Sequence, residues 1–323
     1  MIAAASCREI SLNALDQADH TFVFPPVPDL SSLKASLQEV GLLNPPWVRA
    51  VDGDRFQVVT GWKRLLAAVR LGWEEVTARV LPADTPEARC LLIHLHDNAL
   101  SRGFNPLEQA LLVVRLQQHW DRQTVIQKFL PCLGLAPSLT LLERLLALAV
   151  LEEPLQLLAA RGRLSLPAAQ MLASWGPRDR GAVAAFLEEL PLSQSKQEEF
   201  LQGLDLLARR EGAPPAEILS REEFRQYLRA EAGNLQAKAA AVRLLLQKLV
   251  SPRFSAAQQG FQTGLQRLGL RHHPRLRLQP PPAFEGPDFH LEVKFRDAAE
   301  LQKLLEELGR LARDQEFSDL TSI

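Results

Sequence analysis

The chain has 323 residues, of which 46% are hydrophobic and 23% charged, and its formal net charge is −1. This is ordinary globular composition with enough length for two or three domains. It excludes a uniformly basic nucleic-acid-binding protein, so any such surface must be local. Three cysteines without CxxC spacing favour neither a disulfide framework nor a zinc site. A start without a signal-peptide pattern, and apolar runs broken by charges, predict a cytoplasmic protein that does not enter a membrane.

The first hundred residues are predicted to mix strands and helices. Their apolar alternation predicts strands over 8–12, 46–50, 55–59 and 74–81. The turn Asp52-Gly53-Asp54 joins the second and third of these into a hairpin. Helices are expected over 29–41, 62–71 and 85–100.

From Asn105-Pro106 to about residue 268 the pattern is almost wholly helical. Pro106 suits a first helical position, and Asp121 suits an N-cap. A short helix over 121–130, a turn and an apolar helix from Pro137 have the order of a helix-turn-helix. Proline and glycine within 211–217 indicate a boundary.

The C-terminal stretch returns to mixed structure. Residues 275–279 and 290–295 alternate like half-buried strands, and Asp297 with Glu300 forms a capping box for a last helix. This helix carries an apolar stripe of Leu301, Leu304, Leu305, Leu308 and Leu311. Because such a stripe is too apolar to stay exposed, it predicts a homodimer contact over about the last forty residues.

The stretch from Gln57 to Gly72 predicts an anion site. A strand breaks at Thr60-Gly61 and opens directly into a helix with Lys63 and Arg64 in its first turn. A helix N-terminus offers unpaired N–H groups, and glycine lets a ligand approach the backbone. The helix dipole disfavours cations at this end, so a phosphate between them would explain their presence. A solvated first turn is the simpler explanation from these residues alone.

Four stretches together carry a family resemblance. They are "GWKRLLA" (61–67), "DNALSRGFNPLEQA" (97–110), "ARGRLSLPAAQMLA" (160–173) and "LPLSQSKQEEFL" (190–201). In this order they resemble the ParB family of DNA-partition proteins, whose first two motifs are usually GERRxRA and ENxQRxxLNPxEEA. The resemblance covers roughly residues 8 to 205.

The resemblance implies an α+β, multidomain fold. It implies a small ParB/sulfiredoxin-like α/β nucleotide-binding domain over 1–103 and an all-α helix-turn-helix DNA-binding domain over 104–211. A helical linker region with a basic stretch over 212–270 and a small α/β dimerisation domain over 271–323 would follow. Sulfiredoxin uses a cysteine in its phosphate loop, and Trp62 stands in this loop, so thiol chemistry is not expected.

The resemblance also implies that CTP and Mg²⁺ bind at the first two motifs. Carried over by position, the phosphate-binding residues are Thr60, Gly61, Lys63 and Arg64, and Arg102 replaces a displaced cation. Asp97 and Asn98 would be the metal ligands, since Mg²⁺ prefers oxygen atoms. The chain departs from the family at Trp62, Leu66 and Leu100-Ser101, and "FPPVPD" replaces the family's earlier box, so fewer cations face the triphosphate.

Two regions are candidates for DNA contact. The second helix of the predicted helix-turn-helix offers Ser138 and Thr140 early, and its first cation is Arg144. The span between Glu231 and Glu285 lacks any Asp or Glu and contains Lys238, Arg243, Lys248, Arg253, Arg267, Arg271, Arg275 and Arg277. A field of such cations suits phosphate backbones irrespective of sequence. A solvated face whose acids lie across an interface explains the span equally well.

By resemblance the protein is a DNA-binding partition or nucleoid-associated homodimer. It would act as a CTP-gated DNA clamp in chromosome or plasmid segregation, with a partition ATPase as partner. An alternative is a ParB-fold enzyme, either a nuclease or a phosphotransferase, and a weak CTPase activity is compatible with the motifs. A second alternative is a transcription regulator that has lost nucleotide binding.

Overall fold

The computed structural model describes residues 6–16, 19, 21–23, 29–51, 54–99, 102–229 and 234–322. The turn residues Asp52 and Gly53, most of "FPPVPD", Leu100-Ser101 and Glu231 lie outside these ranges. The chain forms two compact units, residues 1–201 and 202–323. The boundaries expected after residues 103, 211 and 270 stay predictions.

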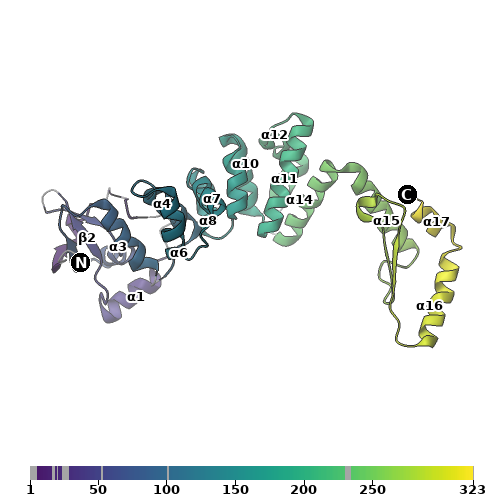
Figure 1. Cartoon of the computed structure of the whole chain (residues 1–323), viewed down its shortest axis with the longest axis horizontal. Coiled ribbons are helices and arrows are strands. Elements are labelled where there is room, and N and C mark those ends of the chain that lie inside the picture. The colour runs from purple at the N-terminus through teal and green to yellow at the C-terminus, as the bar shows by residue number, and fades with distance from the viewer. Residues whose placement is uncertain are drawn as a thin grey trace. The chain divides into compact units, whose positions relative to one another are not determined.

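A four-stranded sheet forms the first part of the N-terminal unit (Figure 1). Its strands are β1 (Ser6–Ser11), β2 (Trp47–Ala50), β3 (Phe56–Val58) and β4 (Glu75–Leu81), in the order β1-β4-β2-β3. Strands β2 and β4 are parallel, and the other two pairs are antiparallel, which confirms the hairpin of β2 and β3. Alternate residues of β4 are buried, as the sequence pattern predicts.

Three helices belong to this part: α1 (Ser31–Val40), α2 (Trp62–Arg70) and α3 (Glu87–Ala99). Helix α2 packs on the sheet, and α1 packs on α2. Asp29 accepts a hydrogen bond from the Ser31 amide at 2.9 Å, and Gly41 ends α1 with φ of 71°. Leu65 and Ala68 of α2 pack into the sheet core, which includes Val48. These contacts hold α2 against the sheet, close to the end of strand β3.

The rest of the N-terminal unit is helical, as expected. Its helices are α4 (Pro106–Leu116), α5 (Arg122–Thr124), the π-helical turn η2 (Val125–Phe129), α6 (Leu130–Cys132), α7 (Leu139–Ala149), α8 (Glu153–Ala160), α9 (Leu166–Ala173), α10 (Pro177–Glu189) and the start of α11 (Gln194–Glu211). The single helix expected over 121–130 is instead α5, η2 and α6, and Pro131, which lacks an amide donor, lies where the regular pattern changes. Helix α7 packs on α4 and α9.

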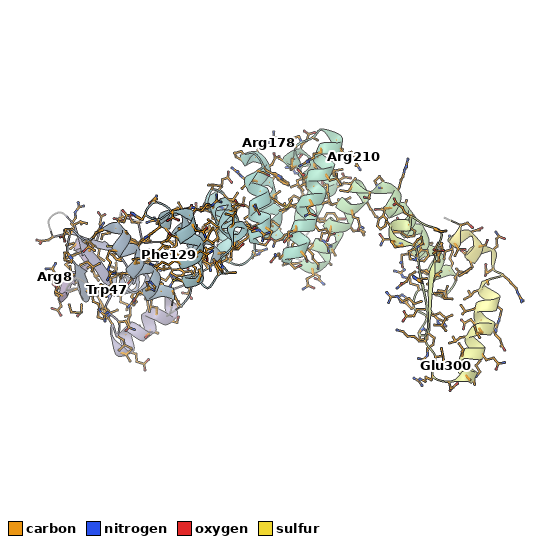
Figure 2. All side chains as sticks on the ribbon, in the orientation of Figure 1. Arg8, Trp47, Phe129, Arg178, Arg210 and Glu300 are labelled. Carbon is orange, nitrogen blue, oxygen red and sulfur yellow. The ribbon has the colours of Figure 1, made fainter. Side chains whose placement is uncertain are left out.

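The C-terminal unit contains helices and a two-stranded sheet. Its elements are the rest of α11, α12 (Pro215–Leu219), α13 (Glu222–Arg229), α14 (Leu235–Val250), α15 (Pro252–Arg267), β5 (Leu276–Gln279), η3 (Pro282–Phe284), β6 (His290–Val293), α16 (Ala298–Leu311) and α17 (Gln315–Thr321). Figure 2 shows Arg210 on α11, whose guanidinium donates to the carbonyls of Leu249 and Val250 at the end of α14. Strands β5 and β6 are antiparallel.

The leucine stripe of α16 is mostly covered by the unit's own core. Leu304 is buried, and Leu308 and Leu311 pack against the cluster that contains Phe261. Leu305 is 57% exposed. Since α15 and the sheet cover most of the stripe, only its exposed part is available to a partner, and the predicted homodimer contact stays a prediction.

Within the part of the chain that the structure describes, no helix combines the length and apolar character needed to span a bilayer.

Candidate functional site

The loop between β3 and α2 has a backbone conformation that only glycine accepts easily. Gly61 has φ of 80° and ψ of 16° and is the N-cap of α2. A Cβ atom at this position would lie 2.8 Å from the Pro46 Cβ and 3.0 Å from a guanidinium nitrogen of Arg64. No side chain caps the helix, so its first amides have no partner within it. The loop therefore presents bare backbone at the positive end of α2.

Thr60 holds the loop to the sheet. Its amide donates to the carbonyl of Trp47 at 3.0 Å, and its hydroxyl accepts from the Trp47 amide at 3.4 Å. Since the residue is 1% exposed, its amide has no access to a ligand. The Thr60 amide is therefore not available to a phosphate as expected, and the unpaired amides beside the loop are those in the first turn of α2.

A cavity of about 460 Å³ opens beside this turn. Four cations line it: Lys63, Arg64, Arg79 and Arg102. The structure thus brings together the three cations expected from the sequence and adds Arg79, an exposed residue of β4. An apolar wall of Phe22, Val23, Leu33 and Pro45 lines the same cavity. No motif pointed to this wall, because these residues precede α2 in the chain and meet it only through the fold.

Two carboxylates balance part of this positive charge. Glu108 Oε2 accepts from Arg102 Nη1 at 2.9 Å, and Glu108 Oε1 lies 3.8 Å from Lys63 Nζ. Asp97 lies 3.7 Å from the Arg64 guanidinium, which also donates to the carbonyl of Asn44. Burial, followed by the charge of Arg102, lowers the pKa of Lys63, and Glu108 opposes this effect. Four cations and two acids leave the cavity electropositive.

The expected metal ligands Asp97 and Asn98 are consecutive residues at the end of α3, so their side chains leave the helix in different directions. Asn98 Oδ1 accepts from Arg102 Nε at 3.0 Å, and Asn98 Nδ2 donates to the carbonyl of His94 at 2.9 Å. The described residues contain no group of three or more His, Cys, Asp or Glu side chains placed to hold a metal. Both oxygen donors already lie against guanidinium groups, so they fit a hard ion only when Arg64 and Arg102 turn to a phosphate and when phosphate and water supply the remaining ligands. They do not fit an ion held by protein alone.

His94 belongs to the core between the sheet and this cavity. It is 4% exposed, its Nδ1 lies 2.7 Å from the Val59 carbonyl, and its ring stacks on Phe22 with centroids 5.8 Å apart. Burial lowers the pKa of His94 to about 4, so it is neutral at physiological pH. His94 therefore supports the wall of the cavity rather than carrying charge into it.

The helix-turn-helix candidates lie at the start of α7. Ser138 is its N-cap, with the hydroxyl accepting from the Leu141 amide at 3.3 Å. Thr140 is exposed, and Leu139 beside it is 50% exposed. Arg144 donates through Nε to Gln170 Oε1 at 3.2 Å. The start of α7 thus offers few polar groups for base contacts.

The cations of the span 232–284 meet acids from later in the chain. Arg267 pairs with Glu316 at 3.2 Å, Arg275 with Glu300 at 3.0 Å, and His273 with Glu307 at 3.4 Å. Figure 2 shows Glu300 on α16. The span lacks acids in sequence, but α16 and α17 supply them in space.

The other predicted DNA contacts in this unit keep their charge exposed. Lys248, Arg271 and Arg277 are exposed and have no ion pair with an acid among the described residues. Arg271 donates to Gln266 Oε1 at 3.1 Å, and Arg243 is half-buried on α14. Arg271, Arg275 and Arg277 line one hollow of about 410 Å³ with Lys294. Four cations at one hollow suit a polyanion, although Glu300 pairs with Arg275 and Glu292 pairs with Lys294.

Comparison with known proteins places the N-terminal part in a family. Residues 4–98 match the model of the ParB N-terminal domain. The probable plasmid-partitioning protein ParB of Thermus thermophilus is 42% identical over 88 residues, which are 27% of this chain and 29% of that protein. The chromosome-partitioning protein Spo0J of the same organism is 30% identical over 190 residues, 57% of this chain and 66% of that protein.

A crystal structure of C-terminally truncated ParB from Caulobacter crescentus with the parS site is 24% identical, with a TM-score of 0.35, and the match covers 60% of this chain and 98% of that chain. This chain spans less than two thirds of the length of the curated relatives, at most 66%. Residues 4–98 of the chain are therefore similar to the ParB N-terminal domain.

Proposed function

We propose that this ParB-like chain is a DNA-binding partition or nucleoid-associated protein whose N-terminal cavity binds CTP with Mg²⁺. The observation that carries the proposal is the Gly61 loop, which places the uncapped N-terminus of α2 at a cavity lined by four cations. A polyanion at this place would engage a helix N-terminus and guanidinium groups together. The family resemblance favours CTP as the polyanion.

Each group of the cavity has a distinct part in this binding. The first amides of α2 and Lys63 bind phosphate oxygens, and Arg64 and Arg102 neutralise the remaining charge. Asp97 and Asn98 orient their oxygens for the metal, which when bound supplies further positive charge to the triphosphate. The partly exposed residues of the apolar wall, Val23, Leu33 and Pro45, exclude water from one side and give a base an apolar surface to lie against.

Titration calorimetry with CTP, ATP, GTP and UTP, each with magnesium, tests the site. Wild type is expected to bind CTP most tightly, and Arg64→Ala to abolish binding without unfolding. Arg70→Ala is the matched control, because Arg70 lies exposed at the other end of α2. Equal CTP binding by wild type and Arg64→Ala would contradict the assignment.

For DNA we propose that the C-terminal unit supplies affinity and α7 supplies little specificity. The exposed cations Lys248, Arg271 and Arg277 support the first part. A cation without a nearby acid can neutralise a DNA phosphate, and this releases a counterion that was condensed on the DNA. The scarcity of polar groups at the start of α7 supports the second part. By the family resemblance, CTP-gated closure around DNA would then serve chromosome or plasmid segregation with a partition ATPase.

We also propose a homodimer through the C-terminal unit, in which the exposed apolar residues of this unit, rather than the whole leucine stripe, make the contact. Leu291 is 41% exposed, Phe295 51% and Leu305 57%. Point changes are a better test of the dimer than deletion of the chain after Pro287, because the deletion would remove Leu304 and Leu320 from the core of this unit. Leu305→Lys with Phe295→Lys is expected to give a monomer by light scattering, and Leu206→Lys, at an exposed leucine of α11, is expected to leave the dimer intact.

A regulator without nucleotide binding is the second candidate. It is favoured by Asp97 and Glu108, which already pair with three of the four cavity cations. Absence of binding by all four triphosphates, with DNA binding retained, would support it. A ParB-fold enzyme would instead turn over a nucleotide or cleave DNA, and phosphate release distinguishes a weak CTPase from a binding protein.

A further inference from the structure

Glu108 is a buried carboxylate that holds two of the phosphate-binding cations. The residue is 2% exposed, although glutamate is almost never buried unless it is paired. Its two oxygens lie 3.8 Å from Lys63 Nζ and 2.9 Å from Arg102 Nη1. Both cations line the cavity beside Gly61, so Glu108 occupies donors that an incoming phosphate would need.

The same side chain belongs to the capping box of α4. Glu108 Oε2 also accepts from the Asn105 amide at 3.0 Å, and Asn105 Oδ1 accepts from the Glu108 amide at 2.9 Å. Glu108 lies in the first turn of α4, where the helix dipole favours a negative charge. The carboxylate therefore has partners on α4 that do not depend on the cavity.

These two sets of partners allow an exchange. Lys63 and Arg102 cannot give their best geometry to Glu108 and to a phosphate at once, so an entering polyphosphate must draw them away. Glu108 then keeps the Asn105 amide and the helix end, which avoids the large cost of an unpaired buried charge.

We propose that Glu108 is an internal competitor for phosphate, which lowers the affinity of the cavity for polyphosphates and couples its occupancy to the first turn of α4. This inference rests on the proposed nucleotide site. It predicts that the cavity discriminates by ligand charge, because a triphosphate brings more charge than a monophosphate to the exchange.

Glu108→Gln tests the competition, because glutamine keeps the length and the capping oxygen but removes the charge. Calorimetry with Mg-CTP and with inorganic tripolyphosphate is expected to show about tenfold tighter binding of both to the variant, corresponding to about 1.4 kcal/mol. Glu75→Gln, at an exposed position at the start of β4, is the matched control and should bind like wild type.

A second measurement uses wild type alone and does not depend on the variant's folding. Tripolyphosphate is expected to change hydrogen exchange at the amides of residues 108–111, because Glu108 loses two partners. Unchanged exchange on saturation would overturn the coupling.

The outcomes separate the inference from the CTP proposal. Binding of CTP by Glu108→Gln that equals or falls below wild type refutes the competitor and leaves the site in place. Tighter tripolyphosphate binding by the variant without preference for CTP supports the competitor and refutes the choice of nucleotide. If neither protein binds either ligand, both proposals fail.

Discussion

The cations of the N-terminal cavity and those of the C-terminal unit differ in how the fold arranges them. In the cavity, Lys63, Arg64 and Arg102 converge on one space beside Gly61 and are paired with Asp97 and Glu108. In the C-terminal unit, exposed cations lie along α14, α15 and β5, and the acids that meet them come from α16 and α17. Convergence around bare backbone suits one compact polyanion, whereas dispersed exposed charge suits a long one.

The largest effect on ligand binding is expected when a side chain is introduced at Gly61. Gly61→Ala places a Cβ atom against Pro46 and Arg64 and is expected to lower CTP affinity by about a hundredfold, or roughly 2.7 kcal/mol. Gly72→Ala is the matched control, because Gly72 has φ of 78° but open space around it. Both variants bear similar backbone strain, so their difference in calorimetry isolates the close approach. Equal losses would mean that strain rather than contact accounts for the glycine.

The wall of the cavity makes the stability of the N-terminal unit depend on pH. Burial lowers the pKa of His94 to about 4 in the folded protein, whereas the ordinary pKa of histidine is about 6.5. The unfolded chain therefore binds more protons between these values, so stability falls as pH drops from about 6.5 to 4, by roughly 3 kcal/mol. Urea unfolding across this range should show the slope in wild type and in His96→Gln, an exposed neighbour, and a smaller slope in His94→Gln.

Most of the sheet, the helix order and the cavity cations could be predicted from the sequence, because they depend on local signals. The Gly61 turn, the Asn105 cap and the alternation in β4 each act within a few residues. Glu108, Arg79 and the Phe22 wall could not be assigned, since their roles arise from contacts between distant segments. The sequence indicated a helix start at Pro106, but nothing in it singled out Glu108.

The same limit applies to the C-terminal unit. The acid-free span left two explanations open, and Glu300 and Glu316, which pair with its arginines from α16 and α17, agree with the one in which acids lie across an interface. The stripe on α16 suggested a partner, yet Phe261 and its neighbours cover most of it. Composition along the chain does not show which residues the fold brings together.

Exposed and paired cations of the C-terminal unit should differ in their effect on DNA binding. Arg271→Gln with Arg277→Gln removes two cations that have no acid partner among the described residues, and should lower the salt slope of binding by about two. Arg267→Gln with Arg275→Gln changes the net charge equally but removes cations already paired, so its slope should fall less. Fluorescence anisotropy on specific and random duplexes at several salt concentrations measures both. A larger fall in the salt slope for the second variant would show that the DNA contacts Arg267 and Arg275, the cations that are paired with acids.

The smallest effects are expected at the start of α7, where the structure gives Ser138 a structural task. Its hydroxyl caps the helix through the Leu141 amide, so Ser138→Ala should lower stability by about 1 kcal/mol in thermal unfolding. Thr140→Ala removes an exposed hydroxyl that caps nothing in the described part of the chain and should be nearly neutral. Neither change should alter the ratio of specific to random DNA binding, because the affinity is proposed to come from the C-terminal cations. Loss of discrimination in Thr140→Ala, at unchanged stability, would show that α7 contacts bases, and the dispersed cations would then contribute affinity without being the main site.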